Sequence, residues 1–270
     1  MVNDLVSWDP TVPIRQEDLD RLVKHDAPQS ALPYRNLIGE LMWVTHTRVD
    51  IMHAVRRLSS YANAYDDYAS WLGLIVVKFI HCTREYGVRI VQSEAARTGT
   101  PLKAPLEIYS YTDASHASIS GDMRSVSGAV TFLQGNPVLV SCQIQKTVAT
   151  SSTESELVAA TEAAKDARHL QILIGELGPE INTPSRIHVD SQGAGFIASN
   201  DKNSSRTRHV AIKHFFCREL VTARFVTFGY VPGTDNVADM FTKALERIKY
   251  AEYAGVLMST LSDMRSWWKQ

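Results

Sequence analysis

Five short segments rich in β-forming residues alternate with helical patterns in the second half of the chain, and this order constrains the fold most. The segments expected to form strands are Leu106–Thr112, Ala129–Leu133, Val138–Gln143, Arg186–Asp190 and Phe225–Val231. With the helices between them they give the order β-β-β-α-β-α-α-β-α, which is typical of a mixed sheet covered by helices. We therefore predict an α/β domain over residues 104–246.

A capping box predicts where the main helix of this domain begins. The run Ser151-Ser-Thr-Glu154 places a hydroxyl at the helix start and a carboxylate three residues later. Apolar residues then recur at helical spacing as far as Ile174, and Gly178-Pro179 ends the helix. Further helices are expected near Gly193–Ser199, over about Val210–Ala223 and from about Asp235.

The first third of the chain has a different pattern. Apolar residues recur at helical spacing over residues 31–86, which predicts a small helical segment spanning residues 31–92. Residues 1–30 form a poorly defined N-terminal segment, and residues 247–270 are expected to be a C-terminal tail. Trp43, Trp71 and the Met42/Met52 pair are assigned to the core of the helical segment.

Four acidic residues fall at the ends of predicted strands or the starts of predicted helices. Asp113 and Asp190 follow strands, at the edge where active sites of open α/β sheets collect. Glu156 lies in the first turn of the main helix, and Asp239 in the first turns of the last one. A single aspartate after a strand is more often a helix cap, but four such positions together favour a site for divalent cations. Glu154, the neighbour of Glu156, is interpreted as a capping residue.

The overall charge gives no support for nucleic-acid binding, because the formal net charge is −1. A local excess of basic residues between positions 202 and 224 could contact phosphates or could be a solvated helix face, and the sequence leaves both open. The basic residues there are Lys202, Arg206, Arg208, Lys213, Arg218 and Arg224.

The cysteines and the apolar runs exclude other classes of protein. The three cysteines are widely spaced and include no CxxC pair, so neither a disulfide framework nor a zinc site is indicated, and an intracellular setting is expected. His209, His214 and Cys217 lack an evident fourth ligand for zinc. The longest apolar run, Trp71–Val77, is too short to span a bilayer, so no membrane partner is expected.

Seven blocks of sequence, in order, carry a resemblance to one protein family. From about Leu106 to Leu245 the chain resembles the ribonuclease H domain of copia-type retrotransposon Pol polyproteins. Residues 34–42, 47–51 and 68–71 resemble the region just downstream of the reverse transcriptase palm in the same polyproteins, while the palm itself is missing. The seven blocks are Tyr111-Thr-Asp-Ala114, Arg124-Ser-Val-Ser-Gly128, Ser151-Ser-Thr-Glu-Ser-Glu156, Val189-Asp-Ser191, Arg206-Thr-Arg-His209, Lys213-His-Phe-Phe216 with Arg218-Glu219, and Asn236-Val-Ala-Asp-Met-Phe-Thr-Lys243.

The resemblance implies a fold and an activity. The fold would be a ribonuclease H-like mixed five-stranded sheet flanked by helices and preceded by a small helical segment of the reverse-transcriptase thumb or connection type. The activity would be hydrolysis, within the strand, of the RNA of RNA–DNA hybrids during reverse transcription. It would take place in a cytoplasmic particle or in the nucleus. A polymerase palm from the same polyprotein is a possible partner, and no polymerase activity is expected from this chain alone.

The same resemblance implies a two-metal site. Two Mg²⁺ ions, with Mn²⁺ as a substitute, would be held by Asp113, Glu156, Asp190 and Asp239. Asp113 would bridge the ions, Glu156 and Asp190 would lie on the leaving-group side, and Asp239 on the side of the nucleophile. The nucleic acid would be contacted by Lys202, Arg206, Arg208, His209 and Lys213.

Several departures from the family pattern keep an alternative open. The chain has Asp113-Ala-Ser-His116 where family members commonly have Asp-Ala-Asp-Trp, and Ala211 stands where they carry an acidic residue. None of these changes removes an expected metal ligand. They permit the alternative of a catalytically weak or inactive retroelement fragment that acts only as a nucleic-acid-binding or interaction module. Tyr65-Asp-Asp67 resembles a polymerase signature but is interpreted as an interhelical turn.

Overall fold

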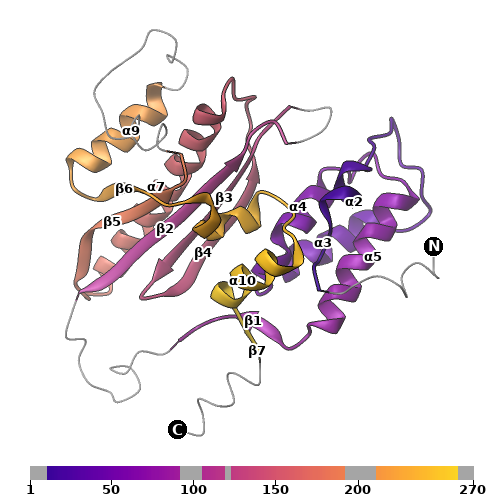
Figure 1. Cartoon of the computed structure of the whole chain (residues 1–270), viewed down its shortest axis with the longest axis horizontal. Helices are drawn as coiled ribbons and strands as arrows, with labels where there is room; N and C mark the ends of the chain where they lie inside the picture. The colour runs from indigo at the N-terminus through magenta and orange to yellow at the C-terminus, as the bar shows by residue number, and fades with distance from the viewer. Residues whose placement is uncertain (1–10, 92–104, 119–122, 192–210, 261–270) are drawn as a thin grey trace, which may run out of the picture. The chain divides into compact units, whose positions relative to one another are not determined.

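The computed structural model describes residues 11–91, 105–118, 123–191 and 211–260 (Figure 1). The chain divides into two compact units, each taken by itself below. Unit 1 consists of residues 1–89 and 243–270, and unit 2 of residues 90–242. All four acidic residues singled out from the sequence belong to unit 2.

Unit 2 is built on a five-stranded sheet. Its strands are β2 (Leu106–Ser115), β3 (Val126–Leu133), β4 (Asn136–Ile144), β5 (Ile181–Val189) and β6 (Val226–Tyr230). Their spatial order is β4-β3-β2-β5-β6. The pairs β2–β5 and β5–β6 are parallel, and the pairs β2–β3 and β3–β4 are antiparallel. The predicted mixed five-stranded sheet is therefore confirmed.

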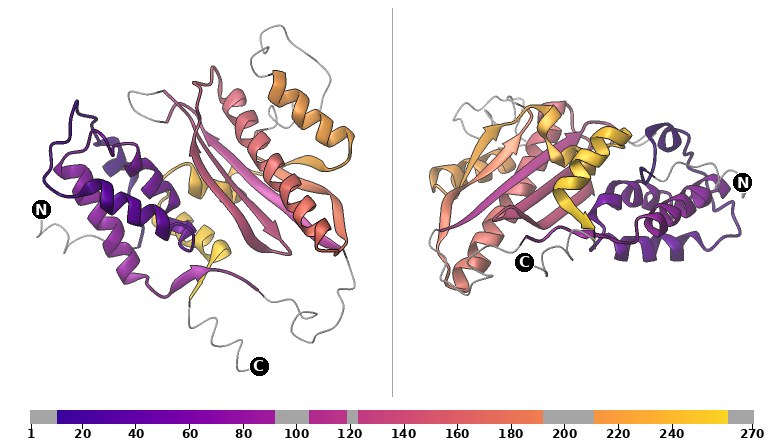
Figure 2. Two further views of the ribbon diagram at one scale, coloured as in Figure 1. Left: turned by 180° about the vertical axis from the view of Figure 1, so that it is seen from behind. Right: turned by 60° about the horizontal axis from the view of Figure 1, so that its bottom comes forward.

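One face of this sheet carries the core of unit 2. The long helix α7 (Ser152–Glu176) packs against β2, β3 and β5, and α9 (Ala211–Thr222) packs beside it (Figure 2). Successive side chains of a strand point to opposite faces, so Leu106 and Ile108 of β2 enter the core while Glu107 is exposed. The alanines of α7 at positions 160, 163, 164 and 167 are fully buried and let the helix approach the strands closely.

The opposite face of the sheet holds aromatic rings and a short 3₁₀ helix. Tyr109 stacks on Phe132 with ring centroids 5.0 Å apart, and Tyr111 stacks on His188 at 4.6 Å. The 3₁₀ helix η4 (Val237–Phe241) follows a shorter one, η3 (Gly233–Asp235), and packs on β2 and β3. The α-helix expected from about Asp235 is therefore wrong over these residues. A further predicted helix, Gly193–Ser199, lies outside the described residues.

Gly128 of β3 allows η4 to approach the sheet. A Cβ atom at this position would lie 2.7 Å from Cβ of Phe241, 2.9 Å from Cγ2 of Thr242 and 3.0 Å from the carbonyl oxygen of Ala238. Because two of these atoms belong to or adjoin the backbone of η4, no side-chain rotation relieves the contact. Any larger residue at position 128 would push η4 away from the sheet.

Unit 1 combines segments from both ends of the chain. Its N-terminal part contains α2 (Gln16–Asp20), α3 (Tyr34–Val44), the 3₁₀ helix η1 (Val49–Ile51), α4 (Met52–Ser59), α5 (Asp67–Cys82) and β1 (Tyr86–Val88). Its C-terminal part contains α10 (Arg247–Leu257) and β7 (Met258–Thr260), and β7 pairs with β1 in antiparallel register. No helix in the described part of the chain combines the length and the apolar character needed to cross a membrane.

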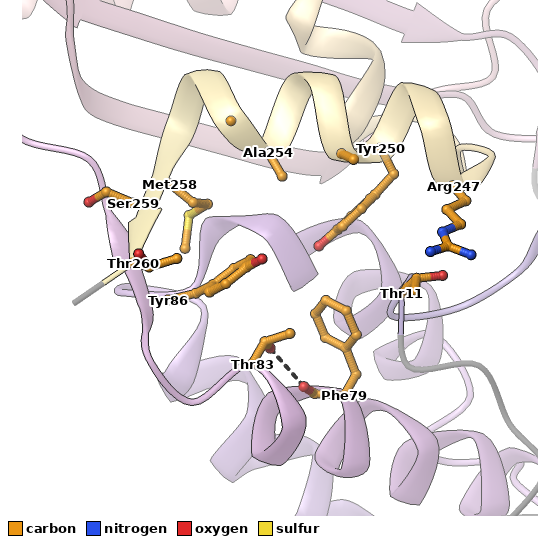
Figure 3. A pocket seen from close by; sticks show the side chains of 12 residues that line it. Thr11, Phe79, Thr83, Tyr86, Arg247, Tyr250, Ala254, Met258, Ser259 and Thr260 are labelled. Carbon is orange, nitrogen blue, oxygen red and sulfur yellow. Dashed lines mark hydrogen bonds between the residues drawn. The ribbon is translucent and has the colours of Figure 1, made fainter. Parts of the chain in front are cut away.

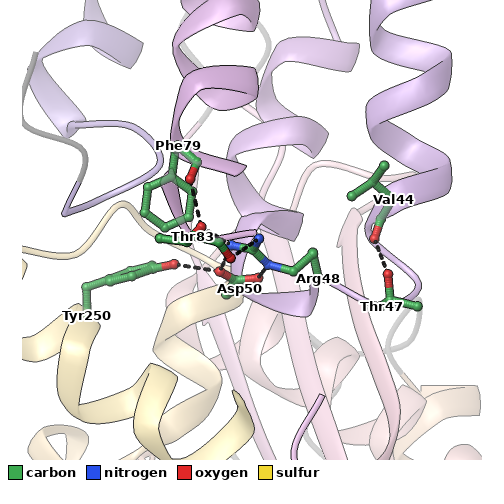
Figure 4. A network of polar contacts seen from close by, with 7 residues as sticks. All are labelled: Val44, Thr47, Arg48, Asp50, Phe79, Thr83 and Tyr250. Atoms are coloured by element: carbon green, nitrogen blue, oxygen red, sulfur yellow. Dashed lines mark hydrogen bonds and ion pairs between the residues drawn. The ribbon is translucent and has the colours of Figure 1, made fainter. Parts of the chain in front are cut away.

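A buried polar network joins the two parts of unit 1 (Figure 4). The guanidinium of Arg48 donates to both carboxylate oxygens of Asp50, at 2.9 and 2.7 Å, and also to Thr83. The hydroxyl of Tyr250, in α10, donates to the same carboxylate at 3.1 Å. Next to this network a cavity of about 460 Å³ is walled by Phe79, Tyr86 and Tyr250 among others (Figure 3). Burial and Asp50 raise the pKa of Tyr250 well above its usual value, so this phenol remains a donor.

The core expected for the helical segment is partly wrong. Trp43 is 77% exposed and Met42 is 44% exposed at the end of α3, whereas Trp71 and Met52 are half-buried. The buried face of α3 is formed instead by Tyr34, Ile38 and Leu41. Trp43 lies two residues after Leu41, and at 100° per residue this spacing turns it away from that face.

The first prediction concerns the acid sensitivity of unit 1. His53 of α4 is buried, and this burial, with Arg57 nearby, lowers the pKa of its imidazole from 6.5 to about 3. Between pH 6.5 and about pH 3, His53 binds a proton in the unfolded chain but not in the folded chain. The free energy of unfolding is therefore not reduced by His53 above pH 6.5, and it decreases as the pH falls below that value. We expect a loss of about 1.4 kcal/mol per pH unit below pH 6.5. In thermal unfolding at pH 7.5 and 4.5, His53→Leu should narrow the difference between the two midpoints.

The unsubstituted chain, measured at the same two pH values, supplies the control. An unchanged midpoint difference in His53→Leu would contradict the buried, neutral imidazole.

The second prediction tests the close packing of η4 on β3. Gly128→Ala should destabilise the chain by about 1–3 kcal/mol, the usual cost of overpacking a filled site. Gly175→Ala in α7 is the matched control, because a Cβ there meets no atom within 4 Å, and it should be neutral or stabilising by up to about 1 kcal/mol. Urea unfolding of both variants measures the difference. Equal stability of the two would show that η4 does not depend on Gly128.

Candidate functional site

Three of the four acidic residues predicted from the sequence come together in unit 2. Asp113, Glu156 and Asp190 each offer a carboxylate oxygen, and these oxygens lie within 4.8 Å of one another. Asp113 and Glu156 are buried and Asp190 is half-buried. The group therefore lies at the surface of unit 2, with one side chain toward solvent.

The parallel pairing of β2 and β5 places Asp113 beside Asp190. Thr112 is directly opposite Val189 in the register of the two strands, so the residues that follow each of them emerge at the same sheet edge. Both strands point the same way, and their carboxyl ends meet there. The Oδ2 atom of Asp190 also lies 3.6 Å from the position that a Cβ on Gly233 would take, at the start of η3.

Glu156 reaches this edge from α7. The helix begins at a capping box: Ser151 Oγ accepts from the N–H of Glu154 at 3.2 Å, and the carboxylate of Glu154 accepts from the N–H of Thr150 at 2.7 Å. Glu154 is thus occupied at the helix start, as the sequence indicated. Two residues further on, Glu156 Oε1 accepts from the N–H of Ala114 at 3.2 Å. This bond fixes the carboxylate next to Asp113, because Ala114 is the following residue.

Asp239 is placed differently from the other three. It lies in η4, is 8% exposed, and is outside the group of three carboxylates defined by the 4.8 Å spacing. Asn236 caps η4 by accepting from the N–H of Ala238 at 3.2 Å, and it donates to the carbonyl oxygen of Thr112 at 2.9 Å. Thr242, just after η4, donates a hydrogen bond to Asp113. Asp239 is therefore carried by a turn tied to β2 at both Thr112 and Asp113.

Asn236 and Thr242 received no role from the sequence, although both lie within the block Asn236–Lys243. The signal available was the position of Asn236 close to the helix start predicted near Asp235, where capping residues are common. Nothing local to Thr242 indicates that its hydroxyl reaches a residue 129 positions away in the sequence.

The electrostatics of the group favour a bound cation. Two unit charges 4.8 Å apart repel by about 3 kcal/mol at an effective dielectric constant of about 20, and the group contains three such pairs. A divalent cation would offset this repulsion. The donors are all carboxylate oxygens, which suit hard ions such as Mg²⁺, Mn²⁺ or Ca²⁺ rather than zinc.

The aromatic rings behind the carboxylates are uncharged at neutral pH. Tyr111 and His188 lie two residues before Asp113 and Asp190 on the same strands, hence on the same face. Burial raises the pKa of Tyr111, with the charge of Asp235 adding to the effect. Burial and the nearby Arg186 lower the pKa of His188. The stacked pair therefore packs as neutral rings beneath the site.

Most of the residues predicted to contact nucleic acid cannot be placed. Lys202, Arg206, Arg208 and His209 lie outside the described residues, and Lys213 is half-buried in α9. His214 and Cys217, considered for zinc, are buried in α9 and are not part of the metal-type group found in the described parts of the chain. Burial raises the pKa of the Cys217 thiol, and Thr161 lies 3.4 Å from its sulfur.

The chain matches no family model. Among known proteins, it is 29% identical over 223 residues to the retrovirus-related Pol polyprotein from transposon RE2 of Arabidopsis thaliana. This match covers 82% of this chain and 14% of the polyprotein. It is 33% identical over 144 residues to secreted RxLR effector protein 161 of Plasmopara viticola, covering 52% of this chain and 93% of that protein.

Among solved structures, the N-terminal RNase H domain of a Mycobacterium tuberculosis protein, fused to maltose-binding protein, matches with a TM-score of 0.39 and 14% identity. The match covers 56% of this chain and 97% of that one. The chain spans only about a seventh of the polyprotein it resembles, since the matched part is 14% of that protein's length. The sequence relatives confirm the predicted resemblance to copia-type retrotransposon Pol polyproteins, because the polyproteins of RE2, RE1 and TNT 1-94 are 27–29% identical to this chain over 221–233 residues.

Proposed function

We propose that this chain is a metal-dependent ribonuclease that cuts the RNA strand of RNA–DNA hybrids during reverse transcription of a copia-type element. The observation that carries this proposal is the convergence of Asp113, Glu156 and Asp190 at one sheet edge, with carboxylate oxygens within 4.8 Å of one another. Similarity to retrotransposon Pol polyproteins supports a nuclease over other uses of a carboxylate cluster.

The donor set fits the metal pair expected for such an enzyme. Asp113, Glu156 and Asp190 would hold the ions, and Asp239 would add a fourth carboxylate from η4. When bound, two divalent ions activate a water molecule as the nucleophile and neutralise charge on the leaving oxygen.

The protein's own contribution is to hold its ligands in place before the ions arrive. The strands β2 and β5 fix the backbone of Asp113 and Asp190, and the N–H of Ala114 holds Glu156. Because Asp113 and Glu156 are buried, water competes little for their oxygens, and charges interact more strongly there than at an exposed surface. An ordered set of ligands lowers the cost of reorganisation during the reaction.

The grip on the substrate would come from the basic segment that includes Lys202, Arg206, Arg208, His209 and Lys213. Lysine and arginine there would contact phosphates, and 2′-hydroxyls in a wide minor groove would distinguish RNA from DNA. A reverse transcriptase palm would be supplied by the remainder of the polyprotein. The exposed Trp43 and Met42 in unit 1 are suited to contact with another protein segment.

The third prediction is Mg²⁺- or Mn²⁺-dependent cleavage of an end-labelled RNA strand in a hybrid duplex by the whole chain. Chelation of the metal should stop the reaction. Asp113→Asn and Glu156→Gln should each lower the rate by more than about 100-fold, beyond the range usual for the loss of an outer-shell partner of a metal. The measurement is the initial rate of fragment appearance on a denaturing gel.

Glu162→Gln is the matched control for Glu156→Gln. It lies on the same helix, pairs with Lys165 at the surface, and should leave the rate unchanged. Cleavage that persists with chelator, or that survives Asp113→Asn, would contradict the proposal.

A second candidate is a binding module without turnover. The departures from the family pattern favour it, because Ser115 and His116 follow Asp113 and Ala211 stands where an acidic residue is common. This candidate predicts that the chain folds and retains hybrids in a binding assay without producing fragments in Mg²⁺ or Mn²⁺. The cleavage experiment therefore separates the two functions directly.

A further inference from the structure

The turn that carries Asp239 ends in a buried threonine whose side chain contacts the metal site. Thr242 is 2% exposed, and its hydroxyl donates to Oδ2 of Asp113. The same hydroxyl oxygen lies 3.3 Å from the carbonyl oxygen of Asp239, but that carbonyl already accepts from the N–H of Thr242 at 3.2 Å. A hydroxyl has one proton, and a charged acceptor forms the stronger bond. The hydroxyl of Thr242 therefore donates its hydrogen bond to the carboxylate of Asp113 and not to the carbonyl of Asp239.

The surrounding contacts hold this hydroxyl in position. Asn236, at the other end of the turn, donates to the carbonyl of Thr112, the residue before Asp113. Gly128 stands opposite Asp113 in the antiparallel register, and a Cβ there would lie 2.9 Å from Cγ2 of Thr242. The methyl group of Thr242 therefore lies over the open position of Gly128, while its hydroxyl faces Asp113. This arrangement fixes the side-chain rotamer.

We propose that Thr242 is a positioning residue that orients the carboxylate of Asp113 for divalent cations. The terminal torsion of an aspartate has a broad energy profile, so a carboxylate without a fixed donor rotates readily. A hydrogen bond on Oδ2 sets that rotation and uses only part of the acceptor capacity of the carboxylate, which leaves oxygen lone pairs for ions. The donor is neutral, so it stabilises the negative charge without competing with a cation as lysine or arginine would.

The same hydrogen bond couples two of the expected ligands. Thr242 follows Asp239 by three residues, so the bond to Asp113 also ties the end of the η4 turn to β2. Loss of the hydroxyl would free the carboxylate of Asp113 and loosen the turn that carries Asp239. This inference rests on the proposed metal site, but it does not require that the chain turn over substrate.

The fourth prediction is that Thr242→Val, which removes the hydroxyl and keeps the shape, weakens Mn²⁺ binding by about 10-fold. A loss of about 10–100-fold is usual when an outer-shell partner of a metal ligand is removed. Thr242→Ser, which keeps the hydroxyl, should stay within about three-fold of the unsubstituted chain. Isothermal titration of the whole chain with Mn²⁺, without nucleic acid, gives the dissociation constants, and thermal unfolding gives the stability of each variant.

Two further comparisons keep the test decisive. Thr161→Val removes another buried threonine hydroxyl, one that donates within α7 to the carbonyl of Leu157, and it should leave Mn²⁺ binding unchanged. If Thr242→Val does not fold, Thr242→Ala and Thr242→Ser are compared instead, because they differ only by the hydroxyl. Equal Mn²⁺ affinity of the hydroxyl-bearing and hydroxyl-free variants would overturn the role of Thr242.

The titration also distinguishes this inference from the proposed function. A chain that binds Mn²⁺ through Thr242-dependent affinity but does not cut the hybrid would refute the nuclease and uphold the positioning role. If the chain cuts the hybrid, but Thr242→Val and Thr242→Ser bind Mn²⁺ with equal affinity, the nuclease is upheld and the positioning role is refuted. Absence of Mn²⁺ binding by the unsubstituted chain would overturn both.

Discussion

Mutual repulsion of three carboxylates within 4.8 Å is the constraint on which the rest of unit 2 depends. Each pair disfavours the folded, cation-free chain by a few kcal/mol, so the scaffold must hold the side chains together against that force. It does so through the backbone: β2 and β5 pair in parallel, and the N–H of Ala114 holds Glu156. Natural proteins are stable by only about 5–15 kcal/mol, so such a cluster is costly unless it serves a purpose. This cost is itself a reason to assign a cation to the site.

Small residues and backbone-directed hydrogen bonds make the close approach of η4 possible. Gly128 leaves the space that Phe241 and Thr242 fill, and Asn236 bonds to the carbonyl of Thr112 within the strand that carries Asp113. Neither residue has a chemical role of its own. They hold the 3₁₀ helix η4, which has little intrinsic stability, in a fixed position beside the metal site. The position of η4 at the site is thus determined by residues that a search for reactive side chains would not find.

The sequence predicted the parts of the structure that local patterns encode. The five strands and the capping box of Ser151 and Glu154 could be predicted because a run of β-forming residues and the chemistry of a helix start are local signals. The contact of Thr242 with Asp113 could not, since it joins residues 129 apart. The pairing of β1 with β7 was not predicted either, because a strand of three residues is too short to give a recognisable sequence pattern. Trp43 was expected in the core, but the buried face of α3 passes through Tyr34, Ile38 and Leu41.

The chain passes from unit 1 to unit 2 after Arg89 and returns to unit 1 immediately after Thr242, which limits where it can be shortened. From Lys243 onward the residues belong to unit 1, where Tyr250 bonds to Asp50 beside its buried partner Arg48. A fragment that kept α10 but lacked residues 1–89 would leave Tyr250 and the strand β7 without these partners and would expose apolar residues of α10 such as Tyr253 and Leu257. A fragment that ended before Thr242 would lose the donor to Asp113. A fragment limited to unit 2 therefore keeps the hydrogen-bond donor to Asp113 only if it extends through Thr242.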